Sequence, residues 1–420
     1  MKERLFHKNF TLLVLGQASS LFGNFILRFA LSMYILDLTG SAAVFAGMLS
    51  AALIPTILLS PFGGILADRI NRRNLMVALD TLTAVFVTAP LLWGSGGITA
   101  ITALLIALSV LGAFETPAVQ ACVPQMHTGG SLVKANAIIQ QISAFAAFAA
   151  PILGGLLYAA IGLKPLMLGS AACFLTTALL ECFIKLSDPR SDHSGSGKSV
   201  LSTVKSDLSE SMRFMFKEQK SIYKMLVLAA AVNFLIGGIV LIGLPYIVRV
   251  ILDLSAGYYG IAQAAIAIAA ILGGIAAGVL VGKMRMRKLS LLLGLLGLLL
   301  IPVCAVFIIK AGAIPIFTVS VVMFFGMQLA VSIFSIFAVS FIQQKTPVHL
   351  MGKIMAYAAT LSFCILPLGQ IMYGFLFDEF RASVYLVLIP ASVVVIMIGL
   401  LSAGFFKSLE TEQPKNRATP

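Results

Sequence analysis

Apolar residues occur along the chain in long continuous runs that are separated by short polar breaks. The hydrocarbon core of a membrane is about 30 Å thick, and a helix needs roughly 20 apolar residues to cross it. Reading the runs against the charged residues and the Gly and Pro breaks predicts twelve spans. They cover residues 10–36, 42–66, 74–93, 98–123, 135–159, 163–185, 222–249, 257–281, 289–309, 313–343, 350–377 and 383–406.

Composition agrees with membrane helices. Apolar residues make up 60% of the chain and the mean hydropathy is +1.03, whereas soluble domains are about 45–50% apolar. Barrel strands alternate over about 10 residues, but runs such as LLLGLLGLLLIPVCAVFII are continuous. The first run is far longer than the apolar core of about 7–15 residues in a cleavable signal peptide, so we expect it to stay in the mature chain. The predicted fold class is an all-α polytopic membrane protein.

The two halves of the chain resemble each other. A polar, Ser-rich segment at 186–221 separates six predicted spans from six. GILADRINRR at 64–73 aligns with GVLVGKMRMRK at 278–288, and LGGLLY at 153–158 aligns with LGQIMY at 368–373. We therefore predict two pseudo-symmetric six-helix bundles, 1–185 and 222–420, joined by a cytoplasmic linker. Internal repeats of this kind are common in transporters.

Basic residues are distributed unevenly between the two sides of the predicted membrane plan. If both termini are cytoplasmic, 24 of the 29 Lys and Arg residues lie on the inner side. The positive-inside rule favours this orientation in the cell membrane. The net charge of +13 is thus explained by topology, and its spread over every inner loop argues against a nucleic-acid partner.

Three ionisable residues fall deep inside predicted spans, where each costs about 2.5–3.5 kcal/mol to insert. Glu115 and Asp80 are expected about 12 and 9 Å from the inner face, and Arg28 about 12 Å from the outer face. Glu115 is a candidate for binding a proton or cation, because proton uptake removes the cost of burying its charge. It could instead pair with a basic loop residue or face an inner cavity. Asp80 could pair with the loop at 69–73, and Arg28 could hold an anionic ligand, counter Asp37 or reach outward to water.

Other chemistry has little support in the sequence. The chain lacks the Gly-Lys-Ser/Thr loop of ATP hydrolysis, its five cysteines lack paired spacing, and its four histidines lack metal-ligand spacing. We expect no enzyme activity, no cofactor and no metal site. The energy source is then expected to be an ion gradient.

The stretch GGILADRINRR at 63–73 concentrates charge at the inner end of the second span. Gly63 and Gly64 permit close helix packing. Asp68 can accept hydrogen bonds from a helix N-terminus or pair with a neighbouring arginine. The cluster could hold two helices in one conformation and release them in another, or its arginines could be topology markers alone.

This stretch resembles the loop signature of the major facilitator superfamily. The signature is met at Gly64, Asp68, Arg69, Arg72 and Arg73. The sequence departs from it at Asn71, where the family usually has Gly, and the second copy has Gly282 in place of the acid. Twelve spans in a 6+6 repeat agree with the resemblance, which implies the major facilitator fold.

A second stretch resembles the antiporter signature of this superfamily. AAPILGG at 149–155 matches it at Pro151, Gly154 and Gly155, with Ala150 in place of its first Gly. Pro151 can bend the helix and the glycines admit close packing, so the segment could be a hinge and seal or ordinary helix packing.

Two further stretches, KNFTLLVLGQASSLFG and FETPAVQACVP followed by LVKAN, resemble the drug-efflux branch that includes macrolide and siderophore exporters. The resemblance implies proton-coupled efflux of a bulky amphipathic compound by alternating access, with protons, the small-molecule substrate and the lipid bilayer as partners, and with the monomer as the functional unit. Alternatives are an importer, a siderophore, lipid or other metabolite carrier of the same fold, or a transport-dead homologue that acts as a receptor or assembly partner.

Overall fold

The computed structural model describes residues 5–92, 97–186, 219–280 and 286–412. These residues are almost entirely helical, and twelve helical segments among them are long and apolar enough to cross a membrane. The predicted number of spans and the all-α fold class are therefore confirmed.

The helices divide into two compact units. The first comprises Met1–His193 together with Pro245–Ala264, and the second comprises Ser194–Leu244 together with Ala265–Pro420. The segment 245–264, which closes the seventh span and opens the eighth, thus packs with the first half of the chain. The predicted division at 186–221 stays a prediction, because 187–218 lies outside the described residues.

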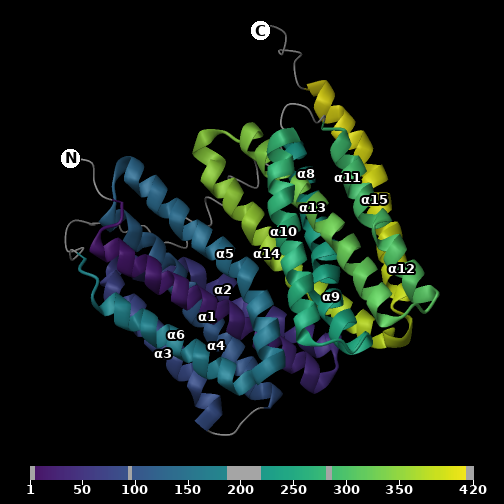
Figure 1. Cartoon of the computed structure of the whole chain (residues 1–420). Coiled ribbons are helices and arrows are strands. Elements are labelled where there is room, and N and C mark those ends of the chain that lie inside the picture. The colour runs from purple at the N-terminus through teal and green to yellow at the C-terminus, as the bar shows by residue number, and fades with distance from the viewer. Residues whose placement is uncertain (1–4, 93–96, 187–218, 281–285, 413–420) are drawn as a thin grey trace. The chain divides into compact units, whose positions relative to one another are not determined.

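The first unit is built around its first helix, which packs against α5 and α6 (Figure 1). α2 packs on α4, and α3 packs on both α4 and α6. The six helices of the first half are α1 (Lys8–Thr39), α2 (Ala42–Arg69), α3 (Arg72–Leu92), α4 (Ile98–Met126), α5 (Gly129–Ile161) and α6 (Leu163–Cys182). A dry apolar core lies between these helices and includes Phe10, Leu13, Met76, Ala118 and Val123, all fully or nearly fully buried.

The second unit is built from helices that pack mainly as α11 on α15, α13 on α11 and α12, and α14 on the seventh span. Its long helices are α8 (Lys220–Val232), α10 (Ala256–Leu280, shared with the first unit), α11 (Lys288–Leu298), α12 (Leu300–Ile308), α13 (Ala313–Lys345), α14 (Val348–Glu379) and α15 (Tyr385–Glu412). A short 3₁₀ turn, η5 (Arg381–Ser383), precedes α15.

The seventh and ninth spans are less regular than their apolar runs suggest. Beyond α8, the seventh span winds through the π-helical turns η2 (Asn233–Gly237), η3 (Ile239–Gly243) and η4 (Ile247–Ile251), with α9 (Leu244–Tyr246) between the last two. The ninth span breaks at Leu299, between α11 and α12. Near this break the Ser392 hydroxyl donates to the Gly297 carbonyl over 2.8 Å. Wide turns and interrupted helices in membrane proteins are frequent near functional sites.

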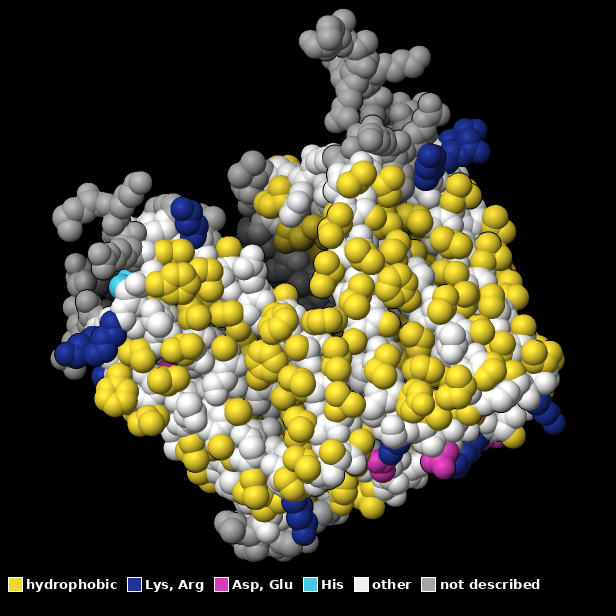
Figure 2. Space-filling view, viewed as in Figure 1, with side chains coloured by type: hydrophobic (Ala, Val, Ile, Leu, Met, Phe, Trp, Pro, Cys, Tyr) yellow, Lys and Arg dark blue, Asp and Glu magenta, His cyan; other side chains and the backbone are white. Residues whose placement is uncertain are grey.

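Large apolar side chains cover the outside of these helices. Figure 2 shows hydrophobic side chains over most of the face in view, with Lys and Arg gathered toward its borders. Leu401 of α15, for example, is 77% exposed. A water-soluble protein rarely exposes large contiguous apolar patches, so these side chains are suited to contact lipid.

Candidate functional site

Glu115, in the middle of α4, faces a cavity inside the first unit. The cavity has a volume of about 220 Å³. Its polar lining residues are Gln17, Ser20, Asn24, Glu115, Thr116, Gln120, Asn136, Gln140 and Ser143, from α1, α4 and α5. The Ser20 hydroxyl lies 3.2 Å from Glu115 Oε1. Among the described residues Glu115 makes no ion pair with a basic loop residue.

Asp80, in α3, is completely buried and is not among the residues that line this cavity. Its Oδ1 lies 3.2 Å from the same Ser20 hydroxyl. Its other close neighbour is the carboxyl group of Glu181, at the end of α6. Arg72, the loop arginine nearest in sequence, donates instead to the carbonyl of Ala121 over 2.9 Å. The described contacts of Asp80 are thus with Ser20 and two glutamates. The pairing with the loop at 69–73 stays a prediction, because the Arg69 side chain lies outside the described residues.

Arg28 is held inside the first unit by neutral polar groups. Its Nε donates to Asn24 Oδ1 over 2.7 Å and its Nη1 donates to Ser109 Oγ over 3.2 Å. It also exerts an electrostatic attraction on Glu115. Asp37, which the sequence offered as a counter-charge for Arg28, pairs with Arg249 instead.

The residues of the loop signature are only partly described. The side chains of Gly64, Asp68 and Arg69, at the inner end of α2, lie outside the described part of the chain. Just before them, a Cβ at Gly63 would lie 2.3 Å from the Ala113 carbonyl of α4, so this glycine permits a close helix crossing. Arg73 donates to Asn74 through Nε and Nη2, over 3.1 and 3.0 Å. The structure therefore neither supports nor opposes a role for Asp68.

At the other end of the first unit, Asp37 joins three parts of the chain. Arg249 of η4 donates to Asp37 Oδ1 through Nε over 3.0 Å and also through Nη2. Tyr158 of α5 donates its hydroxyl to Asp37 Oδ2 over 2.9 Å. Arg249 also donates to the Leu254 carbonyl. We call this set, Asp37, Tyr158, Arg249 and Leu254, the outer contact; in the predicted topology it lies on the outer side.

The glycines of the second signature lie beside the outer contact. A Cβ at Gly155 would lie 2.7 Å from the Ala256 carbonyl, and one at Gly260 would lie 2.7 Å from the Pro151 carbonyl. α5 and the start of α10 therefore cross almost backbone to backbone. A Cβ at Gly154 would lie 3.1 Å from the Phe29 ring. We call this crossing of α5 and α10 the glycine seam.

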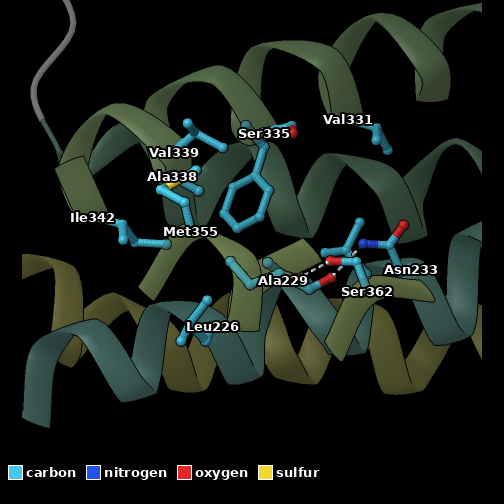
Figure 3. A pocket seen from close by; sticks show the side chains of 13 residues that line it. Leu226, Ala229, Asn233, Val331, Ser335, Ala338, Val339, Ile342, Met355 and Ser362 are labelled. Atoms are coloured by element: carbon cyan, nitrogen blue, oxygen red, sulfur yellow. Dashed lines mark hydrogen bonds between the residues drawn. The ribbon is translucent and has the colours of Figure 1, made fainter. Parts of the chain in front are cut away.

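The second unit contains a cavity of its own, with a volume of about 250 Å³ (Figure 3). Its lining is mainly apolar, with side chains such as Phe334, Ile342 and Met355. Asn233, at the first π turn, and Ser362, of α14, supply polar groups, and each donates to a backbone carbonyl four residues earlier. Figure 3 shows these two side chains close together, away from Met355. A mostly apolar wall with few polar groups suits an amphipathic small molecule.

Three features of the site were missed from the sequence. Glu181 lies near the end of a predicted span and was not counted as buried, yet it is only 1% exposed because α6 packs on α1 and α3. Ser20 was not singled out, although Gln17, Ser20 and Asn24 recur at helical spacing along α1 and mark a polar face. The outer contact joins residues 212 positions apart, and no local pattern signals such a pairing.

Comparison with known proteins agrees with the fold. The family model described as the Major Facilitator Superfamily matches residues 13–369. Macrolide efflux protein A of Streptococcus pyogenes is 27% identical over 173 residues, which are 40% of this chain and 43% of that protein. The match thus spans less than half of the relative's length.

Several solved structures share the whole architecture. A bacterial homologue of the lysosomal transporter Spinster, in an inward-facing and unoccupied conformation, has a TM-score of 0.68 at 14% identity, with all of both chains covered. A bacterial homologue of the iron transporter ferroportin, in an inward-facing state, has a TM-score of 0.68 at 17% identity, with 94% of this chain and 98% of that chain covered. A D-xylose–proton symporter has a TM-score of 0.67 at 14% identity, with 94% and 96% covered. At these identities the likeness shows the fold alone.

Proposed function

Because the chain belongs to the major facilitator superfamily and is a multi-pass membrane transporter rather than an enzyme, we propose that it exports bulky amphipathic compounds in exchange for protons. The export runs across the cell membrane by alternating access, with both termini cytoplasmic. Protons and the exported compound are the partners, and a single chain is sufficient. The partial likeness to macrolide efflux protein A favours this class of substrate over sugars, peptides or metals.

The main support for this proposal is the position of Glu115 in the cavity of the first unit. The carboxyl group sits among amide and hydroxyl side chains of α1, α4 and α5, next to apolar wall residues such as Leu21 and Ile139. A partly buried carboxylate is costly in a membrane, and taking up a proton or meeting a cationic or polar ligand removes that cost. Glu115 can bind either a proton or the ligand, but not both at once. Because each displaces the other, proton movement in one direction is coupled to compound movement in the other.

The two cavities differ in chemistry, and each by itself can contact an amphipathic compound. In the second unit, Phe334 and Met355 supply a polarisable wall that adapts to different shapes, and Asn233 adds a polar amide group. In the first unit, Gln17, Gln140 and Asn136 supply hydrogen-bonding groups without fixed charge.

The outer contact and the glycine seam are the elements proposed to close the outer side. Asp37 gathers Arg249 and Tyr158, and Gly155 meets the backbone of α10 next to them. Breaking the charged contact lets α1 and α5 separate from residues 245–264. Pro151 and Gly154 then act as hinge and seal, and the loop from Asp68 to Arg73 steadies the conformation from the inner side.

The test is a substrate screen in a strain that lacks its own efflux pumps. Cells expressing the chain are loaded with candidate macrolides and other amphipathic compounds, and efflux is followed with and without a proton gradient. We expect uncoupler-sensitive efflux that Glu115→Gln abolishes, while Glu379→Gln, an exposed carboxylate at the end of α14, leaves efflux unchanged. Full gradient-driven efflux by the Glu115→Gln variant would contradict the proton role, and transport of no compound would favour a receptor.

A further inference from the structure

Four helices of the first unit bring three carboxyl groups and one hydroxyl together in the interior. Ser20 comes from α1, Asp80 from α3, Glu115 from α4 and Glu181 from α6. Asp80 is 0% and Glu181 1% exposed, whereas Glu115 borders the cavity. The proposed function uses only Glu115, so the two deeper carboxyl groups are unexplained by it.

The hydrogen-bond geometry around Ser20 favours a proton held in this cluster. The Ser20 oxygen lies 3.2 Å from Asp80 Oδ1 and 3.2 Å from Glu115 Oε1. A hydroxyl carries a single hydrogen, which it donates to one of these oxygens or shares between both in a weaker three-centre bond. If Asp80 or Glu115 carries a proton and donates it to the serine oxygen, both contacts become full hydrogen bonds.

The oxygens of the deeper pair lead to the same conclusion. Within the described part of the chain, Asp80 Oδ2 and both carboxylate oxygens of Glu181 have no hydrogen-bond donor, although all three are buried. The two carboxyl groups lie against each other closely enough to share a hydrogen bond. Two ionised carboxylates offer no hydrogen for such a bond, whereas a single proton between them supplies it. Buried polar groups in native structures are nearly always paired in this way.

The surroundings offer little else to neutralise these charges. Asp80 adjoins the apolar core through Met76 and Leu79. The charged and titratable groups that act on the cluster are Arg28, which attracts Glu115, and Cys122, a buried thiol beside Glu181. Arg72 acts on Cys122 from the inner side. Of these two cations, only Arg28 acts on a carboxyl group, and that group is Glu115. Among the described residues, the charged groups that act on the Asp80–Glu181 pair are themselves carboxyl groups.

We propose that Asp80 and Glu181 form a second proton-binding pair, and that the Ser20 hydroxyl connects this pair to Glu115. This inference rests on the proposed proton exchange and extends it. In the transfer, the Asp80 Oδ1–H bond breaks as a new O–H bond forms at Ser20 Oγ, and the original hydroxyl hydrogen of Ser20 passes to Glu115 Oε1. Asp80 becomes ionised and Glu115 neutral, while Ser20 ends with the one hydrogen it began with. Asp80 and Glu181 are then both ionised, and the pair regains its proton from Glu115 by the reverse transfer through Ser20.

The pair can be tested by infrared spectroscopy of the full chain purified in detergent, without any substrate. Protonated carboxyl groups have a C=O stretching band that ionised carboxylates lack and that shifts in deuterated water. We expect this band in the wild-type protein at neutral pH, and its loss or shift in Glu181→Gln and in Asp80→Asn. Glu379→Gln is the matched control and should leave the band unchanged, and the circular dichroism of each variant reports whether it is folded.

The connection through Ser20 needs a second comparison. With Ser20 intact, Glu115→Gln should shift the C=O band of the Asp80–Glu181 pair. In a Ser20→Ala background the same Glu115→Gln change should cause no shift. In a Ser20→Thr background, which keeps a hydroxyl, the shift should return. A band that is absent at neutral pH, or the same in folded Glu181→Gln, would overturn the pair. A shift that survives Ser20→Ala would overturn the connection. Because no transported compound is involved, failure of the efflux assay leaves these results interpretable.

Discussion

The outer contact gives a quantitative prediction, because Arg249 and Tyr158 both donate hydrogen bonds to the Asp37 carboxylate. Arg249 is 16% and Asp37 29% exposed at the side chain. A hydrogen bond to a charged group contributes about 1.5–3 kcal/mol when it is protected from water, and an exposed ion pair about 0.2–1 kcal/mol. For this partly exposed pair we expect a value of about 1–2 kcal/mol in favour of the closed outer side, which is about 5–30-fold in the equilibrium constant.

The perturbation is Arg249→Gln, which removes the charge and keeps a polar side chain of similar length. Phe29 reports on closure, because it is buried and stacks on Tyr259 with ring centroids 5.2 Å apart. A cysteine introduced as Phe29→Cys, in a background without the native cysteines, should react with a membrane-impermeant maleimide about 5–30 times faster once Arg249 is replaced. Lys310→Gln, at an exposed position of the second unit, is the matched control and should leave the rate unchanged.

A double-mutant cycle separates this contact from general loosening. Asp37→Asn and Arg249→Gln remove the same interaction, so the double variant should label no faster than the faster single variant. If the two effects multiply, or if Arg249→Gln leaves the labelling rate at its starting value, the reasoning about the outer contact is refuted.

Three more predictions follow from the described residues and the loop signature. Gly155→Val should abolish transport and raise labelling at position 29, since its Cβ would lie 2.7 Å from the Ala256 carbonyl; transport at the normal rate would show that the seam tolerates a side chain. Asn233→Ala should change the apparent KM about 3–10-fold for ligands with a polar end, the loss of one hydrogen bond, and leave purely apolar ligands unaffected; equal changes for both would mean that Asn233 has a structural role. Asp68→Asn should leave membrane insertion normal and impair transport, measured by surface labelling and efflux; wild-type rates would make the loop a topology marker.

The sequence was sufficient for the fold because membrane helices follow a local rule. Twenty or so apolar residues suffice to mark a span, and each of the twelve predicted spans has a helical counterpart. The π turns after Val232 and the break at Leu299 could not be predicted, because they depend on which backbone packs against the helix. The positions of the glycines gave a hint, but only the structure shows that Gly155 and Gly260 belong to one crossing.

For the site, the sequence identified which charged residues lie inside the spans, but not which residues they contact. Glu115 and Asp80 were selected because they interrupt apolar runs, and they do lie on either side of one hydroxyl group. Glu181 escaped because a position near a helix end normally reaches water, whereas here α1 and α3 cover it. The pairing of Arg249 with Asp37 depends on tertiary structure, because the two residues lie 212 positions apart.

The central claim is that Glu115 exchanges a proton for the exported compound. The most direct measurement follows compound and proton movements simultaneously in vesicles that contain the purified protein, after a compound gradient is imposed. Protons should move opposite to the compound in the wild-type protein, and Glu115→Gln should abolish the coupled proton movement. Proton movement that persists unchanged in Glu115→Gln, or compound transport by the wild-type protein with no proton movement, would contradict the proposed exchange.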